Sequence, residues 1–406
     1  MNDRNLTGKM KENYRFFGIG TALYAGFYAL CLYKNSGGIA FTFFIAGSLW
    51  FYCLCMKKLE VSLKKGSIFY LVTVMLLAVS TFITGDGRII AMNKTGIFFL
   101  TASFLLHQFF EDKNWSFFKY MGNIIKLPFV WIAKVHRPFV DFHKKENEKQ
   151  DNNALYVVLG LLVGIPLLIV VWELLCAADA AFARISRNIF GSLNFGSGFQ
   201  IVFMVLAAFF VTYGIFAYLA ERSLSDEARE KTPVEALPAI IVLIPLTVLY
   251  MVFCWIQIFC LFGGNFNMQG MTYAEYARRG FFDLLAVCIL NLILVQAGYG
   301  FFKKNKVLDI TMTVMSACTY IMIASSAFRM IQYVKHYNLT FLRVFVLWFL
   351  VVLTVLLTGV IISIFKRSFP LFRFSMVVVT VCYLLLSFAH VDYWIASYNL
   401  YRGETA

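Results

Sequence analysis

The sequence predicts an all-α, polytopic integral membrane protein, a helical bundle of about eleven transmembrane helices. Of the 406 residues, 60% are hydrophobic and 18% are aromatic. With a mean hydropathy of +0.73, a soluble globule of this size could not bury so much apolar surface. Apolar stretches of roughly 20 residues, the length that crosses a bilayer core, also recur along almost the whole chain.

Hydropathy gives the order and approximate bounds of the expected spans. They cover residues 16–33, 38–56, 67–84, 89–110, 154–176, 199–220, 238–262, 280–302, 308–330, 340–365 and 371–390. Pro166 and Pro245 lie inside spans and predict kinks. Asn291 and Gln296, in the eighth span, are typical either of hydrogen bonds between helices or of a polar transport path.

Lysine and arginine fall mainly on alternate connections between these spans. Four precede the first span, four follow the second, eight lie in the long connection after the fourth, and three lie in each of the next three connections on the same side. By the positive-inside bias, the N-terminus is cytoplasmic and the C-terminus is extracytoplasmic. This distribution accounts for the net charge of +14, so we expect the lipid bilayer as a partner and no nucleic acid.

The chain divides into three segments by pattern. Residues 1–110 form a four-helix membrane region, and residues 154–406 form a seven-helix membrane region. Between them, residues 111–153 mix Trp, Phe and Ile with basic residues and have prolines at the corners, which is typical of amphipathic helices lying on the cytoplasmic membrane surface. This connection serves either as an elbow that returns the chain to the bilayer or as a docking site for a cytoplasmic partner.

Under this topology, four clusters of polar residues fall on the extracytoplasmic face. They follow the fifth span, precede the eighth, close the ninth and form the C-terminal tail. An intramembrane or interfacial charge is a candidate functional residue. The residues expected to form this outer-face polar network are Asp179, Glu275, Arg278, Arg279, Asp283, Arg329, Tyr333, His390 and Asp392.

The stretch "MTYAEYARRGFFDLL" (271–285) is the densest of these clusters. Thr272 and Glu275 fit a capping box, which predicts that a helix starts at Tyr273. Glu275, Arg279 and Asp283 then follow one another at a spacing of four residues. This spacing predicts ion pairs along one face of the helix.

Arg278 is rotated away from that face. Two interpretations of it stay open. Its partner is either a carboxylate from another helix, such as Asp179 or Asp392, or an anionic lipid or ligand phosphate, which a guanidinium grips with two parallel hydrogen bonds.

The sequence offers no standard catalytic signature. It lacks H-E-x-x-H, G-x-S-x-G, a Walker lysine and G-x-G-x-x-G. If the protein is an enzyme, its catalytic residues are therefore unknown. His390 and Asp392 have no further metal ligands nearby in the sequence, and the nine cysteines lie almost entirely in apolar runs. We therefore expect no metal and no cofactor.

Several stretches carry a resemblance to a known family. They are "LLCAADAAFARI" with Asp179 and Phe182, "TYAEYARRGFFDLLAV", "RMIQYVKHYNLTFLRVFVLWF", "YWIASYNLYR" and, more loosely, "LLHQFFEDKNWSFFKY". From about Leu105 to Arg402 the chain resembles a bacterial multi-pass membrane family described only as a domain of unknown function, of the 4153/4173 type. The resemblance implies a helical bundle in the bacterial cytoplasmic (inner) membrane and brings no catalytic assignment.

We therefore expect a non-enzymatic, transporter-like or signalling-associated membrane protein whose outer polar site binds an anionic lipid or small molecule. The alternative is a membrane-embedded enzyme acting on a lipid-linked or envelope substrate at the same face. His390, Asp392 and Glu275 would then be the groups that transfer protons. The sequence identifies neither the ligand nor a protein partner.

Overall fold

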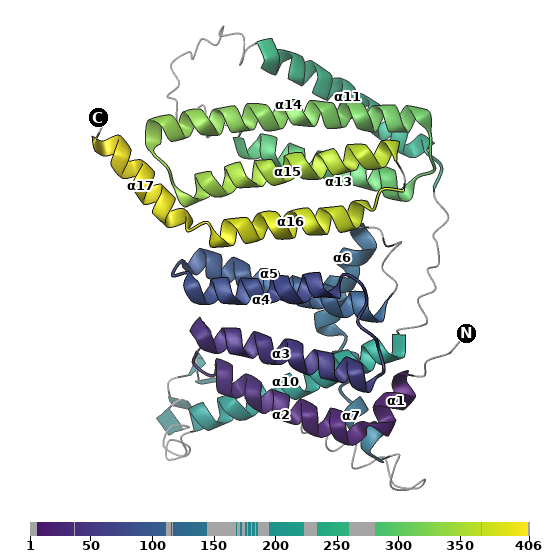
Figure 1. Ribbon diagram of the computed structural model, residues 1–406, viewed down its shortest axis with the longest axis vertical. Helices are drawn as coiled ribbons and strands as arrows, with labels where there is room; N and C mark the ends of the chain where they lie inside the picture. The colour runs from purple at the N-terminus through teal and green to yellow at the C-terminus, as the bar shows by residue number, and fades with distance from the viewer. Residues whose placement is uncertain are drawn as a thin grey trace. The chain divides into compact units, whose positions relative to one another are not determined.

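The computed structural model describes most of the chain as helix. The described residues are 6–35, 37–110, 115, 117–143, 195–222, 234–259, 281–366 and 368–404, together with short pieces between 168 and 185. The chain divides into two compact units, residues 1–112 with 119–228 and residues 113–118 with 229–406. Figure 1 shows the helices with the labels used below.

Ten of the described helices coincide with spans expected from hydropathy. Nine of these are long and apolar enough to cross a membrane, and α4 is a shorter apolar helix. They are α2 (Tyr14–Leu32), α3 (Gly38–Lys58), α4 (Ser67–Ile83), α5 (Gly87–Phe109), α10 (Phe195–Arg222), α11 (Leu237–Gln257), α13 (Phe281–Phe301), α14 (Lys306–Tyr337), α15 (Phe341–Phe365) and α16 (Leu371–Phe388). The chain is thus an all-α membrane protein, as expected. The span at 154–176 lies mostly outside the described residues, so the total of eleven and the orientation stay predictions.

The first unit is a layer of helices in the packing order α10, α2, α3, α4 and α5. Its core gathers around Phe216 of α10, which is 1% exposed. The rings of Phe17 from α2, Tyr52 from α3 and Phe109 from α5 have centroids 6.5, 5.7 and 6.3 Å from that of Phe216. Aromatic pairs at these distances stabilise packing beyond the burial of area alone.

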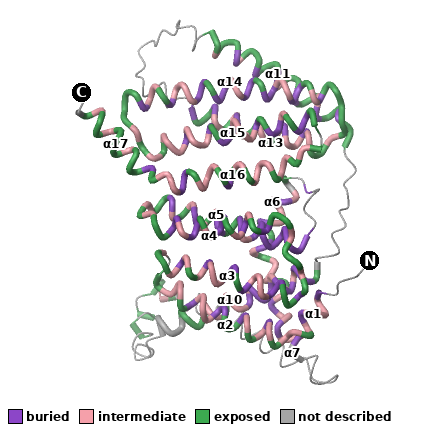
Figure 2. The backbone as a smooth tube through the Cα atoms, in the orientation of Figure 1, coloured by how far each residue is buried: buried purple, intermediate pink, exposed green. Residues whose placement is uncertain are grey.

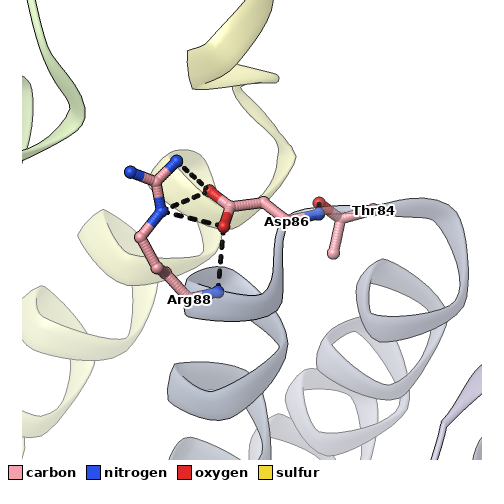
Figure 3. Close-up of polar contacts among 3 residues, drawn as sticks. All are labelled: Thr84, Asp86 and Arg88. Atoms are coloured by element: carbon pink, nitrogen blue, oxygen red, sulfur yellow. Dashed lines mark hydrogen bonds and ion pairs between the residues drawn. The ribbon is translucent and has the colours of Figure 1, made fainter.

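The connection between α4 and α5 shows how an exposed arginine is held in this unit (Figure 3). The Asp86 carboxylate caps α5 by accepting a hydrogen bond from the backbone N–H of Arg88, at 2.9 Å. The Arg88 guanidinium donates to the same carboxylate through Nε and Nη2, each at 2.9 Å. A neighbouring carboxylate therefore satisfies this guanidinium locally.

The elbow expected after α5 consists of short helices: α6 (Phe117–Lys126), the 3-10 turns η2 (Leu127–Phe129) and η3 (Ile132–Lys134), and α7 (Arg137–His143). Lys134 and Arg137 both bind the carboxylate of Glu221 on α10, at 2.5 and 2.7 Å. On α7, the buried Asp141 accepts a hydrogen bond from the Tyr213 hydroxyl of α10 at 2.8 Å. The elbow is thus attached to α10 by charge as well as by packing.

In the second unit, α14 contacts α11, α13 and α15, and α15 contacts α16 (Figure 1). Small side chains allow close approach: a Cβ added at Gly359 of α15 would lie 2.3 Å from the Phe374 ring of α16. Polar contacts add to this packing, because the Asn291 amide of α13 donates to Thr319 Oγ1 of α14 at 3.0 Å. Of the two interpretations of Asn291, the structure shows the hydrogen bond between helices.

Two helices differ from the hydropathy prediction, one in where it ends and one in that it forms at all. α14 continues to Tyr337, beyond the expected span end at 330. Hydropathy falls at Arg329, Lys335 and His336, but the backbone hydrogen bonds of a helix do not depend on side-chain polarity, so the helix continues. The polar tail forms a further helix, α17 (Val391–Glu404), that was not expected as an element. The division of the sequence at residues 110 and 153 stays a prediction.

Candidate functional site

The second unit contains a cavity of about 370 Å³ between α11, α13 and α14. This volume lies at the lower end of the range typical of small-molecule sites. The described residues that line it are Leu249, Tyr250, Phe253 and Gln257 of α11, Asp283, Leu284 and Val287 of α13, and Met322 and Arg329 of α14. Two residues of the predicted polar network, Asp283 and Arg329, thus share one cavity.

The three polar residues of the lining come from three different helices. Gln257 lies at the C-terminal end of α11, Asp283 in the first turn of α13, and Arg329 in the last third of α14. The Gln257 side-chain carbonyl accepts hydrogen bonds from Arg329 Nη2 at 3.2 Å and from Ser325 Oγ at 2.8 Å. Gln257 therefore fixes the position of one edge of the guanidinium.

The other lining residues that the structure describes are apolar and continue away from these polar residues. Along α11 it passes through Phe253 to Tyr250 and Leu249, and along α14 it reaches Met322. Eight residues of α-helix, from Gln257 to Leu249, correspond to about 12 Å at 1.5 Å per residue. The lining surface is therefore mostly apolar, and the polar residues lie together at one end along the helix axes.

One turn beyond Arg329, the residues of the third predicted cluster hold the end of α14. The Arg343 guanidinium lies 4.1 Å from the ring centroid of Tyr333, a cation–π contact. Its Nη1 donates to the backbone carbonyl of Tyr337 at 2.6 Å and to that of Asn338. Asn338 leaves the helix with a positive φ of 65°. The described contacts of Tyr333 and Arg343 therefore fasten the α14–α15 turn.

The tail is bound to the same turn. Asn399 of α17 accepts a hydrogen bond from the Leu339 backbone N–H at 2.8 Å and donates one to the Leu339 carbonyl at 2.9 Å. Arg402 Nη1 donates to the Val334 carbonyl of α14 at 3.2 Å. The stretches "RMIQYVKHYNLTFLR" and "YWIASYNLYR" are therefore in contact through residues that lie 60 and 68 positions apart in the sequence.

His390 and Asp392 lie where α17 begins. His390 adopts a positive φ of 46°, and its carbonyl accepts a hydrogen bond from the Tyr393 N–H at 2.9 Å. Asp392 is in the first turn of α17, where a carboxylate stabilises the helix dipole. Neither residue belongs to the described lining of the cavity. These positions fit a role in turning the chain between α16 and α17.

The other predicted site residues are placed only in part. Asp179 belongs to the first unit, and its Oδ1 accepts hydrogen bonds from the N–H groups of Ala181 and Phe182 at 2.6 and 3.2 Å. Glu275, Arg278 and Arg279 fall within residues 260–280, outside the described residues. Their expected capping box and ion pairs stay predictions.

The described residues contain no group of three or more His, Cys, Asp or Glu side chains that could hold a metal ion. The residue that sequence reasoning did not include in the site is Gln257. It was visible as an isolated amide near the outer end of an apolar span. Nothing in the sequence indicated that α11 would place this amide against Arg329.

A family model described as "Domain of unknown function (DUF4153)" matches residues 71–406. The match covers most of the chain, including the three helices that line the cavity. No curated protein and no solved structure gives a significant match.

Proposed function

This chain belongs to the family described as a domain of unknown function (DUF4153), and on that premise we propose that it is a ligand-binding protein of the bacterial cytoplasmic membrane. Its role is transporter-like or signalling-associated. Its site is the cavity between α11, α13 and α14, and the ligand carries an anionic group that binds Arg329.

One observation carries the proposal: Gln257, Asp283 and Arg329 reach a single cavity from three helices. A charged side chain in or near the hydrocarbon region is costly, so a protein keeps one there when it pairs with another group or binds a ligand. An apolar cavity with a few convergent polar groups is the usual form of a ligand site. Arg329 contacts Gln257 and lines a mostly apolar cavity, and this supports the proposal.

The predicted orientation supports an extracytoplasmic site. In that topology the C-terminal end of α11, the N-terminal end of α13 and the C-terminal end of α14 all lie on the outer side. Arg278 and Arg279 precede Asp283 in the sequence by five and four residues. We propose that they add positive charge at the same end and attract the anionic group.

The test is mass spectrometry of the lipids and small molecules that co-purify with the full chain in mild detergent. Wild-type protein should retain a specific phosphate- or carboxylate-bearing species. Arg329→Gln should reduce it about tenfold or more, because a hydrogen bond to a charged group contributes roughly 1.5–3 kcal/mol. Arg329→Lys, which keeps the charge but loses the planar fork, should give an intermediate loss.

Arg88→Gln is the matched control, because this arginine binds Asp86 in the other unit and should leave retention unchanged. The double variant Arg278→Ala with Arg279→Ala should lower retention at unchanged folded yield. The proposal fails if Arg329→Gln protein is folded and retains the same species in the same amount.

A further inference from the structure

The cavity lining contains both a positive and a negative side chain, and it continues into an apolar region. These features indicate the chemical class of the ligand. Resting on the proposed function above, we propose that the ligand is a zwitterionic phospholipid with a primary ammonium in its headgroup. Its phosphate binds Arg329, its ammonium binds Asp283, and part of an acyl chain occupies the apolar end of the cavity.

The apolar end indicates a ligand with a hydrocarbon part. Phe253, Leu249, Val287 and Met322 line the cavity beyond the polar residues. A free inorganic anion would contact only the polar end and leave this apolar lining without a partner. An amphiphile matches both ends of the cavity. Its polar head can lie at the polar end while its hydrocarbon chain extends along the apolar lining.

The surroundings of the cavity indicate that the amphiphile comes from the bilayer. Leu249 is 61% exposed although it lines the cavity. The side chains next to it on α11, including Val248 and Val252, are exposed and apolar, and Figure 2 marks exposed positions along this helix. In a membrane protein such a face contacts acyl chains, so a lipid chain can enter the cavity from the side.

The length of α14 supports a polar end at the depth of the headgroups. α14 has 32 residues and is therefore about 48 Å long, longer than a hydrocarbon core of about 30 Å. Arg329 belongs to its last third, close to Lys335 and His336. Trp255 of α11 lies close to Gln257 in sequence, and its ring packs against that of Phe259 in a tilted arrangement, with centroids 4.6 Å apart. Aromatic residues of this kind mark the membrane interface.

The presence of opposite charges in one lining selects the headgroup. Asp283 is exposed, while Arg329 of the same lining is partly buried and hydrogen-bonded to Gln257. Of the described lining residues, the guanidinium attracts a purely anionic headgroup and the carboxylate repels it. A headgroup that carries both a phosphate and an ammonium can satisfy both side chains. A quaternary ammonium has no N–H to donate, so a choline headgroup would bind Asp283 less well.

The experiment measures lipid bound to the purified full chain by native mass spectrometry. The probe is an equimolar mixture of phosphatidylethanolamine, phosphatidylglycerol and phosphatidylcholine with identical acyl chains. Phosphatidylethanolamine should be enriched about fivefold over each of the others, the effect of a contact worth about 1 kcal/mol. Asp283→Asn should remove its preference over phosphatidylglycerol without abolishing lipid binding.

Matched variants isolate the two ends of the cavity. Asp309→Asn removes a carboxylate from the opposite end of α14 and should keep the wild-type preference. Val287→Trp, which fills the apolar end, should reduce bound long-chain lipid about tenfold. Leu249→Trp also fills the apolar end, but from an exposed position. It replaces Val287→Trp in the experiment if that variant does not fold.

The outcomes separate the two proposals. If Arg329→Gln loses a bound anion and both tryptophan variants keep it, the ligand is not a lipid and only the present inference fails. Equal binding of the three lipids, or an unchanged preference in Asp283→Asn, also overturns the zwitterion assignment. If no variant changes any bound species, the proposed binding function fails as well.

Discussion

At the scale of single residues, Asn399 joins segments that are far apart in the sequence. Its amide pairs with both the N–H and the carbonyl of Leu339, and so satisfies backbone groups at the turn between α14 and α15. Leaving a buried backbone group without a hydrogen-bond partner destabilises the fold by more than an average hydrogen bond stabilises it. Among the described contacts, Asn399 therefore attaches α17 to this turn by two hydrogen bonds.

We expect Asn399→Ala to loosen α17. Loss of both hydrogen bonds should cost about 1–3 kcal/mol, which would raise the open population of the tail about 5–150-fold. Limited proteolysis of the detergent-solubilised chain measures this population, because cleavage requires local opening. Asn35→Ala, in the exposed turn after α2, is the control and should leave cleavage near the C-terminus at the wild-type rate. Equal rates in both variants would contradict the role of Asn399.

The sequence predicted some of these residues and not others, for a definite reason. Hydropathy shows which charged residues lie at the ends of apolar spans. Asp283 and Arg329 could therefore be selected as interfacial charges. Which helices are neighbours depends on side-chain packing between apolar surfaces that look alike in sequence. The contact of Gln257 with Arg329 joins two helices, and that of Asn399 with Leu339 joins a helix to a distant turn, so neither could be predicted.

At the scale of elements, the elbow and α10 approach each other at a glycine. A Cβ built at Gly214 would lie 2.8 Å from Trp131 Cβ and 2.9 Å from its Cα. Backbone cannot rotate away as the end of a flexible side chain can, so the two elements would have to separate. The close contact therefore requires glycine at this position.

We expect Gly214→Ala to destabilise the protein, since forcing extra volume into packed elements costs about 1–3 kcal/mol. Gly26→Ala is a matched control in α2, where nothing lies within 4 Å of the added Cβ. There the change should be neutral or stabilising, because alanine favours helix over glycine by about 1 kcal/mol. Thermal unfolding in one detergent compares them. A midpoint for Gly214→Ala at or above that of Gly26→Ala would show that α10 and the elbow can separate without cost.

Element positions were predictable to the extent that they depend on hydropathy. The spans at 340–365 and 371–390 match α15 and α16 closely, because both are continuous apolar runs with polar boundaries. α17 was not predictable in this way. Its residues alternate between apolar and polar without a long apolar run, and its helix is attached through Asn399 and Arg402.

At the scale of the whole molecule, the distribution of basic residues predicts the orientation. Reporter fusions after Arg187 and after Glu404 should both give extracytoplasmic signals, because the basic connections hold the other side in the cytoplasm. A fusion after Lys65, in a basic connection, is the matched control and should report the cytoplasm. A cytoplasmic signal after Glu404 would reverse the side on which Arg329 and Asp283 lie, and would remove the extracytoplasmic part of the proposed function.

The fold class could be predicted at this scale, and the packing order could not. Composition and periodic apolar runs are enough to exclude a soluble globule. They do not specify that α10 packs on α2, or that α14 contacts α11, α13 and α15, because any pair of apolar helices satisfies the same pattern. Small residues at close approaches and buried hydroxyl or amide groups make that choice.

The position of α14 among three neighbours has a consequence for how this family changes over evolution. Half of its most apolar window is buried, against 17% for α16. A substitution on α14 must suit several partner helices at once, whereas most positions of α16 need only remain apolar. Sequence divergence among family members should therefore be slowest along α14 and fastest along α16, with the polar residues around Arg329 changing together with Gln257 and Asp283.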